Sequence, residues 1–499
     1  MPPQALAAVA ALVSFASHGN RIDFELDRGS AEMVWLTPST FRFRRTLEGP
    51  LPEIRREDGR PVPLEIDDTP GRVTVRSKIL DVSLQKNGLL LRVRRMDGTP
   101  LMADLSEPRV SGGSVVWERQ SLTGARFYGL GPRIHPELDL RGKAVPSDVP
   151  FLVCTVGYGE FHALTGAYRF DFTGQDRYRI QAPAVDYYFY YGPTAKQVFE
   201  EHRERANAAG SWTAAADGAG SWTTLRSTLL RLVHGAMSAM PAPSLSLRPY
   251  QGGPEELVLR ARQLGSLVDD VSPGPVGLSS FRKQLESFFA TYAEETRDKG
   301  FPLWHPLPFQ FPDDPECARH ADEFMLGDEM LIAPICEPGG KRAVYLPQGV
   351  WTNLDTGEAI PGRRTINVET QALPVFARNG TIVPLDSAGA MALHYFPRLA
   401  AEFFLLENDP PDWTQVHAAP AGDLMRLEIE AKKAKDYQWV VHHVERPAEV
   451  GFEDRRYREV KSPAEVADRT WFYDATRKSL NVRVRVAAGE DCIVNVVFP

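Results

Sequence analysis

Two long regions of strand-like sequence enclose one short helical region, and this arrangement limits what the chain can fold into. Residues 10–193 contain many short runs in which apolar and polar side chains alternate, such as RIDFELD and RVTVRS, separated by turn signals such as Asp97-Gly98. After Pro302 the pattern is again mostly strands as far as Pro499. Because many short strands at near-regular spacing are typical of β-sandwiches, we expect a mainly β fold with a reduced α/β middle.

The middle region, residues 194–300, is too short for a large α/β domain. Apolar side chains recur at helical spacing in residues 225–236, 257–268 and 281–292, and Thr194 can cap a further helix. We interpret each of these sets of apolar side chains as the face of a helix that packs in a hydrophobic core. One βαβ unit takes about 30 residues or more, and a (β/α)8 barrel typically takes about 250. The region can therefore hold three or four helices with a few strands, but not eight βα repeats.

A low-complexity patch lies inside this middle region, at residues 206–224. It is rich in Gly, Ala and Ser, and the tetrapeptide GSWT occurs twice, at 210–213 and 220–223. Sequences of this composition behave as flexible connections more often than as core elements. We therefore expect a flexible joint here.

Charge and cysteine content exclude several classes of function. The chain has 57 Lys and Arg against 65 Asp and Glu, a net charge of −8, and no long run of one sign. This balance argues against nucleic acid or an anionic membrane as a partner. The four cysteines show no CxxC or Cys/His spacing, so we expect buried free thiols, no metal site and no cofactor; they are Cys154, Cys317, Cys336 and Cys492.

The first residues bear on where the protein works. Residues 5–15 are apolar, but no Lys or Arg precedes them, and together with the residues that follow they read as a strand, a turn at Gly19-Asn20 and a second strand. A signal peptide normally begins with a positively charged region. We therefore interpret the run as mature protein, which favours a cytoplasmic over a secreted location.

One long segment carries a family resemblance. Residues 300–385, which begin GFPLWHPLPFQFPDDPE and end LPVFARNGTIVPL, resemble the end of the catalytic barrel and the following β domain of family 31 glycoside hydrolases, the α-glucosidases and α-xylosidases. Residues 126–133, 148–161 and 186–194 are similar to the N-terminal sandwich of the same family.

The resemblance implies a four-part organisation. Residues 1–193 would form a galactose-mutarotase-like N-terminal β-sandwich, and residues 194–300 the remnant of a (β/α)8 barrel. Residues 301–388 would form a proximal C-terminal β domain, and residues 389–499 a distal C-terminal β-sandwich. Loss of most of the barrel would uncover sandwich faces, and exposed apolar faces usually mark an interface. A homo-oligomer or a hetero-complex is the expected consequence.

The resemblance also implies which residues would carry hydrolysis. Retaining glycosidases use two carboxyl groups about 5–5.5 Å apart, a nucleophile and an acid/base. The family's nucleophile motif, of the type Trp-x-Asp-Met-Asn-Glu, has no match in this sequence. The acid/base motif, Trp-Thr-Gly-Asp-Asn followed by a Trp, has a partial match in Trp212-Thr213, Asp217 and Trp222. Asp217 is thus the candidate catalytic residue, and an ordinary Asp-Gly turn is the alternative interpretation.

Three further residues are candidates for substrate binding. In residues 239–265 the family outline places Ser246 where a pocket Asp would lie and Tyr250 where a Phe would lie. Serine lacks the charged acceptor that grips sugar hydroxyls. Asp148 follows the N-terminal loop region of the family, and His305 replaces the Arg of its Arg-Pro-Leu run. For Asp148 and His305, structural packing is the competing interpretation.

Three functions remain open from the sequence. The first is a family 31-like protein without activity as a single chain, serving as a carbohydrate-binding or assembly scaffold. The second is an active α-glycosidase that uses Asp217 as acid/base with a relocated or partner-supplied nucleophile. The third is a structural subunit of an oligomer. Such a resemblance predicts the fold, whereas the function depends on the residues of the site.

Overall fold

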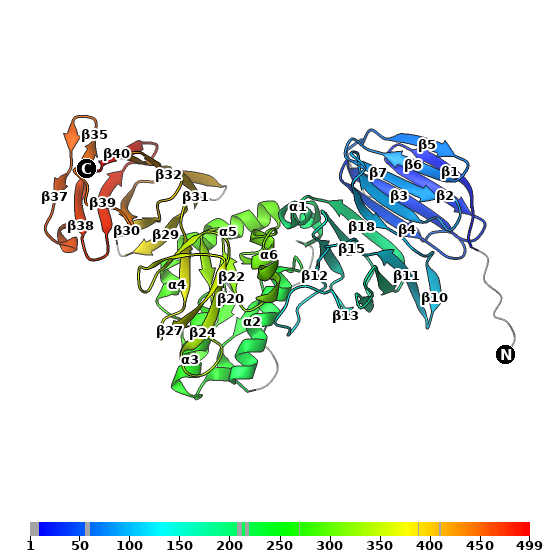
Figure 1. Ribbon diagram of the computed structural model, residues 1–499, viewed down its shortest axis with the longest axis horizontal. Coiled ribbons are helices and arrows are strands. Elements are labelled where there is room, and N and C mark those ends of the chain that lie inside the picture. Colours follow the sequence, from blue (N-terminus) through cyan, green and yellow to red (C-terminus); the bar gives the residue numbers. More distant parts are fainter. Residues whose placement is uncertain are drawn as a thin grey trace. The chain divides into compact units, whose positions relative to one another are not determined.

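The computed structural model describes residues 9–54, 60–206, 212–214, 219–268, 270–387, 389–408 and 411–499. The chain forms two compact units (Figure 1). The first contains the residues up to Arg133, residues 137–208 and Met237–Met240. The second contains Ile134–Pro136, residues 209–236 and Pro241–Pro499. The finer division into four domains stays a prediction.

The described part of the first unit is built from three antiparallel sheets. An eight-stranded sheet has the order β1-β2-β3-β4-β18-β15-β14-β12, and two five-stranded sheets have the orders β10-β11-β17-β16-β13 and β5-β6-β7-β8-β9. The strands of the first sheet are β1 (Leu12–His18), β2 (Arg21–Leu26), β3 (Ser30–Thr37), β4 (Thr40–Arg45), β18 (Val185–Tyr191), β15 (Tyr158–His162), β14 (Phe151–Cys154) and β12 (Phe127–Gly129). Those of the others are β10 (Arg109–Ser111), β11 (Ser114–Gln120), β17 (Arg177–Ala182), β16 (Tyr168–Asp171), β13 (Ala144–Ser147), β5 (Glu65–Thr69), β6 (Arg72–Arg76), β7 (Leu80–Gln85), β8 (Leu91–Arg95) and β9 (Pro100–Ala103).

Alternating side chains explain this part of the fold. In β7 every second residue is buried, namely Leu80, Val82 and Leu84, because one face of the strand meets the core. Strand β18 is buried along nearly its whole length. The reason is α1 (Ala195–Ala206), which packs on β18, β15 and β14 and covers the face that would otherwise meet water.

Helix α1 lies unusually close to its sheet at Gly159. A Cβ atom at this position would lie 2.3 Å from Cγ1 of Val198, so only glycine permits the observed approach. Phe199 and His202 lie on the same buried side of the helix, and the His202 ring stacks on Phe151 with centroids 4.3 Å apart. Burial lowers the pKa of His202 to about 3, which makes it a neutral packing residue.

The second unit begins with a small parallel α/β layer. Thr213 pairs in parallel with Ser244, and β19 (Ser244–Ser246) pairs in parallel with β20 (Asp270–Ser272). Helices follow each strand: α2 (Trp222–Ala236), α3 (Glu255–Gly265), α4 (Phe281–Gln284) and α5 (Glu286–Lys299), with short η1 (Arg248–Tyr250) and η2 (Gly274–Val276) between them. This alternation resembles a βαβαβ unit whose first strand is represented by the isolated bridge at Thr213. Its origin as part of a larger barrel stays a prediction.

The next part of the second unit, from β21 to β28 and here called the proximal part, is strand-rich and is built around one core. A six-stranded sheet has the order β21-β22-β23-β28-β25-β26, and β24 pairs with β27 beside it. Its core includes Trp351, Phe376 and Cys317, all fully buried. The elements are β21 (Trp304–Pro306), α6 (Leu307–Gln310), η3 (Pro315–Arg319), β22 (Phe324–Leu326), β23 (Met330–Ile332), β24 (Lys341–Leu346), β25 (Val350–Asn353), β26 (Ala359–Pro361), β27 (Arg364–Glu369) and β28 (Val375–Arg378).

The distal part consists of two six-stranded sheets. Their orders are β29-β30-β34-β39-β38-β37 and β31-β32-β33-β40-β35-β36. The strands are β29 (Ile382–Ser387), β30 (Ala390–Tyr395), β31 (Ala401–Asn408), β32 (Asp412–Ala421), β33 (Leu424–Glu430), β34 (Lys435–Val441), β35 (Glu449–Phe452), β36 (Arg455–Arg456), β37 (Arg458–Glu459), β38 (Thr470–Asp474), β39 (Ser479–Val486) and β40 (Asp491–Val497), with η4 (Pro463–Glu465).

The expected mainly β fold with helices in the middle region is confirmed. Four helices of eleven residues or more, α1, α2, α3 and α5, lie between the two strand-rich regions. The cysteines are free as expected, although Cys492 is only partly buried. Of the patch predicted to be a flexible joint, residues 207–211 and 215–218 lie outside the described residues. Throughout the described ranges, helices are too short or too polar to cross a membrane.

Candidate functional site

The carboxyl ends of the parallel strands are where catalytic side chains of the second unit would be expected. Functional side chains of parallel α/β folds lie in the loops that follow the strands. Residues 247–254, after β19, and residues 273–280, after β20, contain neither Asp nor Glu. Residues 214–221, which follow Thr213 in the sequence, contain one acidic residue, Asp217, which lies outside the described residues. The three stretches that follow Thr213, β19 and β20 in the sequence therefore contain one acidic residue in total.

Ser246, at the end of β19, is used by the local backbone. Its hydroxyl oxygen accepts a hydrogen bond from the N–H of Arg248 at 3.4 Å, and the N–H of Leu247 donates to the carbonyl of Ser272 at 2.9 Å. Leu247 packs closely on Gly265, where a Cβ atom would lie 2.7 Å from Cδ1 of the leucine. A tight turn after β19 and the packing of α3 on Leu247 thus occupy the space at the end of this strand.

Tyr250 lies in η1 and is 3% exposed. Burial raises the pKa of Tyr250 to about 12, and the polar influence of Thr228 of α2 opposes this rise. Beside it, the N–H of Gly220 donates to the carbonyl of Pro249 at 3.0 Å. The tyrosine therefore joins η1 to α2, and its predicted role in substrate binding stays a prediction.

His305 lies in β21 and is fully buried. Its ring lies among Phe309, Tyr292 and Phe301, with centroid distances of 5.0, 6.2 and 6.5 Å. Its Nδ1 lies 3.1 Å from Oδ1 of Asp328, but the angles are not those of a hydrogen bond, and Nε2 has no partner among the described residues. The aromatic surroundings agree with the packing interpretation of this histidine.

Asp148 is exposed and follows β13 in the first unit. The preceding Ser147 accepts a hydrogen bond from the N–H of Val149 at 3.1 Å, which fixes the turn around the aspartate. Asp148 is thus accessible, whereas Tyr250 and His305 are buried at different places in the second unit. Sugar binding by these three residues stays a prediction.

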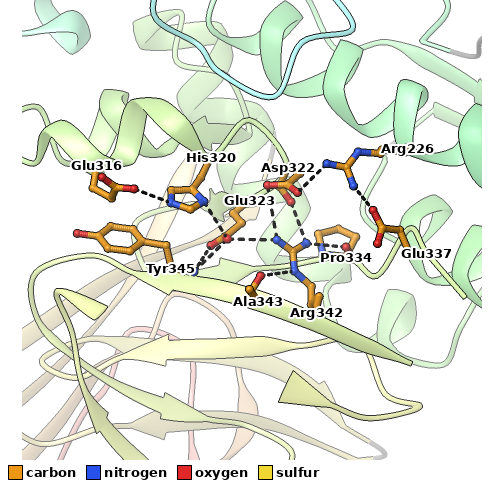
Figure 2. A network of polar contacts seen from close by, with 10 residues as sticks. All are labelled: Arg226, Glu316, His320, Asp322, Glu323, Pro334, Glu337, Arg342, Ala343 and Tyr345. Atoms are coloured by element: carbon orange, nitrogen blue, oxygen red, sulfur yellow. Dashed lines mark hydrogen bonds and ion pairs between the residues drawn. The ribbon is translucent and has the colours of Figure 1, made fainter. Parts of the chain in front are cut away.

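A polar network with Glu323 buried at its centre lies around residues 316–345 of the second unit (Figure 2). Nη2 of Arg342 lies 3.1 Å from Oε1 of Glu323 and 3.6 Å from Oδ1 of Asp322. The N–H of Tyr345 donates to both carboxylate oxygens of Glu323, at 3.0 and 3.1 Å. Burial raises the pKa of Glu323, whereas the guanidinium of Arg342 and the backbone donor oppose that shift.

The same network contains a possible set of metal ligands. His320, Asp322 and Glu323 offer ligand atoms within 4.8 Å of one another. However, Arg342 already binds both carboxylates, and the ring of His320 stacks on Tyr345 with centroids 5.0 Å apart. A second cation beside the buried guanidinium would be repelled. The donor set therefore fits an internal ion pair and not a metal centre.

A second buried acid lies near His305. Glu329 accepts a 2.7 Å hydrogen bond from the hydroxyl of Tyr292, and the N–H of Asp328 also donates to it at 3.0 Å. Burial and then the charge of Asp328 raise the pKa of Glu329 to about 8. Sequence reasoning missed Glu323, Glu329 and their partners; the one available signal is three acidic residues in the otherwise apolar run EFMLGDEMLI.

Comparisons with known proteins show a family likeness for part of the second unit. Residues 300–383 match the glycosyl hydrolase family 31 C-terminal domain. An α-glucosidase of Saccharolobus solfataricus is 36% identical over 129 residues, which are 24% of this chain and 18% of the relative. Neutral α-glucosidase AB of Mus musculus is 32% identical over 163 residues, 30% of this chain and 17% of the relative. The matched segments thus span less than a fifth of these relatives.

Solved structures show likeness over nearly the whole chain. A family 31 dextranase of Flavobacterium johnsoniae, solved with isomaltotriose, has a TM-score of 0.79 at 13% identity and covers 98% of this chain and 100% of its own. A cycloalternan-forming enzyme from Listeria monocytogenes, solved with a pentasaccharide substrate, has a TM-score of 0.81 at 13% identity and covers 98% and 77%. At such identity the likeness is one of fold.

Proposed function

Because the chain is a glycoside hydrolase family 31-like protein, we propose that it is a non-catalytic relative that serves as a carbohydrate-binding or assembly scaffold. The observation that carries the proposal is the set of loops after the parallel strands. Asp217 is the one acidic residue in the stretches 215–220, 247–254 and 273–280. A double displacement at a sugar needs a second carboxyl group at about 5–5.5 Å, and these loops do not supply it.

The test is hydrolysis of aryl α-glucosides and aryl α-xylosides by the purified chain. We expect no turnover above that of an Asp217→Asn variant prepared in parallel. Turnover in the wild type that disappears in Asp217→Asn would contradict the proposal. Turnover that persists in Asp217→Asn would point to a contaminating enzyme, which a second preparation with a different affinity tag identifies.

One observation favours the alternative, an active α-glycosidase. Thr213 forms an isolated parallel bridge with Ser244, and Asp217 follows Thr213 by four positions in the sequence. Enzymes with α/β folds place catalytic groups after the carboxyl ends of parallel strands. Asp217 would act as acid/base, and a carboxylate from elsewhere in the chain or from a partner would act as nucleophile. The hydrolysis assay decides between the two functions.

Carbohydrate binding is tested separately from hydrolysis. The dextranase was solved with isomaltotriose and with glucose, and the cycloalternan-forming enzyme with a pentasaccharide substrate. Glucose, isomaltotriose and a longer malto-oligosaccharide are therefore suitable probes for calorimetric titration. Asp148 is the one accessible candidate residue in the described part, and Asp148→Asn should weaken binding if it contacts the sugar. Asp97→Asn, also exposed in the first unit, is the matched control.

Assembly is the second half of the proposal, and it includes the structural-subunit hypothesis. The support for it is the expectation from the sequence that loss of most of a barrel uncovers sandwich faces, and that exposed apolar faces usually mark an interface. Light scattering on the purified chain at several concentrations measures its mass directly. A monomer at every concentration, together with absence of sugar binding, would contradict the scaffold function.

A further inference from the structure

Strand β1 is the outermost strand of the eight-stranded sheet and pairs with β2 on one side (Figure 1). Its beginning is covered on the other side, because the N–H of Leu12 donates to the carbonyl of Lys86 at 2.8 Å. Beyond Leu12, no strand in the described ranges pairs with the outer edge. Because side chains and backbone groups alternate in an antiparallel ladder, every second N–H and C=O of this stretch points outward.

The sequence of β1 lacks the features that normally protect such an edge. It reads LVSFASH, with no Lys, Arg, Asp, Glu or Pro over seven residues. Val13 is 63% exposed, and Phe15 is partly buried and packs on the core of the first unit. In natural proteins, edge strands are usually short or carry charged residues or prolines, because these features prevent an open edge from pairing with another chain.

All other outer strands in the described sheets carry such protection. Each of them has three residues or fewer, or contains a charged residue or a proline. These strands are β5, β9, β10, β12, β13, β19, β20, β21, β24, β26, β27, β29, β31, β36 and β37. For example, β5 reads EIDDT and β36 reads RR. The open edge of β1 is therefore an exception within this chain and not a general property of its sheets.

We propose that β1 is a self-association edge, at which two copies of this chain pair antiparallel about a two-fold axis beside Phe15. The two eight-stranded sheets then continue into one another. In this register Val13 lies opposite Ser17 of the second copy, and Phe15 lies opposite its own equivalent. The proposal rests on the assembly half of the proposed function and names the surface that assembles.

A second copy fits this edge better than an unrelated strand does. A two-fold axis makes the interface isologous, so each edge satisfies the backbone groups of the other over the same residues. Like charges directly opposite one another destabilise a strand pair, and β1 has no acidic or strongly basic side chain to create such a clash. Self-pairing of β5 or β36 would bring like charges together. Aromatic pairs, as at Phe15, stabilise cross-strand contacts.

The test is the mass of the full chain by sedimentation velocity over a hundredfold range of concentration. We expect a concentration-dependent dimer for the wild type and a monomer for Val13→Lys, because the introduced ammonium groups oppose pairing at the edge. Val110→Lys is the matched control: Val110 is 68% exposed and lies in β10, outside the proposed edge. Circular dichroism shows whether each variant is folded.

A charge-pair variant tests the register. In Val13→Lys combined with Ser17→Glu, each lysine would lie opposite a glutamate of the second copy, so the dimer should return. A wild-type monomer would overturn both this inference and the assembly half of the proposed function. A wild-type oligomer that survives Val13→Lys and Ser17→Lys would overturn this inference alone. A dimer lost in Val13→Lys but not regained in the double variant would overturn the Phe15-centred register.

Discussion

Tyr292 donates a 2.7 Å hydrogen bond from its hydroxyl to Oε2 of Glu329, and each of the two residues is 7% exposed. The hydroxyl comes from α5, and the acid comes from the turn between β22 and β23. The contact therefore ties the last helix of the α/β layer to the strands that follow it in the second unit. Burial, which disfavours the charged form, raises the pKa of Glu329 to about 8.

Glu329→Gln should be more stable than the wild type above neutral pH and about equally stable at pH 5. The folded state keeps a proton that the unfolded chain releases above its ordinary pKa of 4.5, so wild-type stability falls as pH rises toward 8. The slope is at most about 1.4 kcal/mol per pH unit. Urea unfolding at pH 5, 7 and 8.5 measures it, with the exposed Glu445→Gln as control. Equal pH slopes in wild type and Glu329→Gln would show that Glu329 is charged when folded.

Arg342→Met should destabilise the second unit strongly. The Arg342 side chain is 11% exposed and the Glu323 side chain 1%, so removal of the guanidinium leaves a buried carboxyl group without its cation. Breaking a buried pair in this way typically costs about 3–5 kcal/mol. The measurement is the free energy of unfolding of the second unit, by urea titration followed through tryptophan fluorescence.

The matched control is Arg485→Met, which breaks an ion pair with Asp436 on the surface of the distal sandwich. The Arg485 side chain is 75% exposed, so its loss should cost at most about 1 kcal/mol. If both variants lose the same small amount, the network of Figure 2 contributes no more than an ordinary surface pair.

Gly159→Ala should destabilise the first unit by about 1–3 kcal/mol through overpacking. The added methyl group would lie 2.3 Å from Cγ1 of Val198, so α1 must move away from β15. Val198→Ala removes the clashing atom, and the double variant should recover part of the loss. Thermal unfolding of the two single variants and the double variant forms a double-mutant cycle. A purely additive loss in the double variant would contradict the contact.

The sequence predicted which regions are sheet because burial in strands such as β7 leaves a period of two. It could not predict partners that are distant in the chain. Arg342 follows Glu323 by 19 positions, and their pairing depends on where β24 lies in the folded domain. Likewise, the open edge of β1 is a property of sheet order. Asp217 rests on its motif alone, since it lies outside the described residues.

His394 and His442 form a hydrogen-bonded pair in the distal sandwich, with Nδ1 of the first 3.0 Å from Nε2 of the second. Phe396 stacks on His442 with centroids 4.4 Å apart. Burial lowers the pKa of His394 to about 4; burial, followed by the charges of His394, His443 and Arg477, lowers that of His442 to about 3. A pair of this kind stays neutral in the folded state under conditions that protonate the unfolded chain.

Stability of the second unit should therefore fall as the pH falls from about 6.5 toward 4. The unfolded histidines take up protons that the folded pair does not. The contribution of the neutral pair to the free energy of unfolding is therefore fully present above pH 6.5 and is lost on acidification. His442→Gln should flatten this dependence by up to about 1.4 kcal/mol per pH unit. His417→Gln, on partly exposed β32, is the control. Denaturant titrations at pH 7, 5.5 and 4.5 measure the slopes, and an unchanged slope in His442→Gln would show that the pair is already protonated when folded.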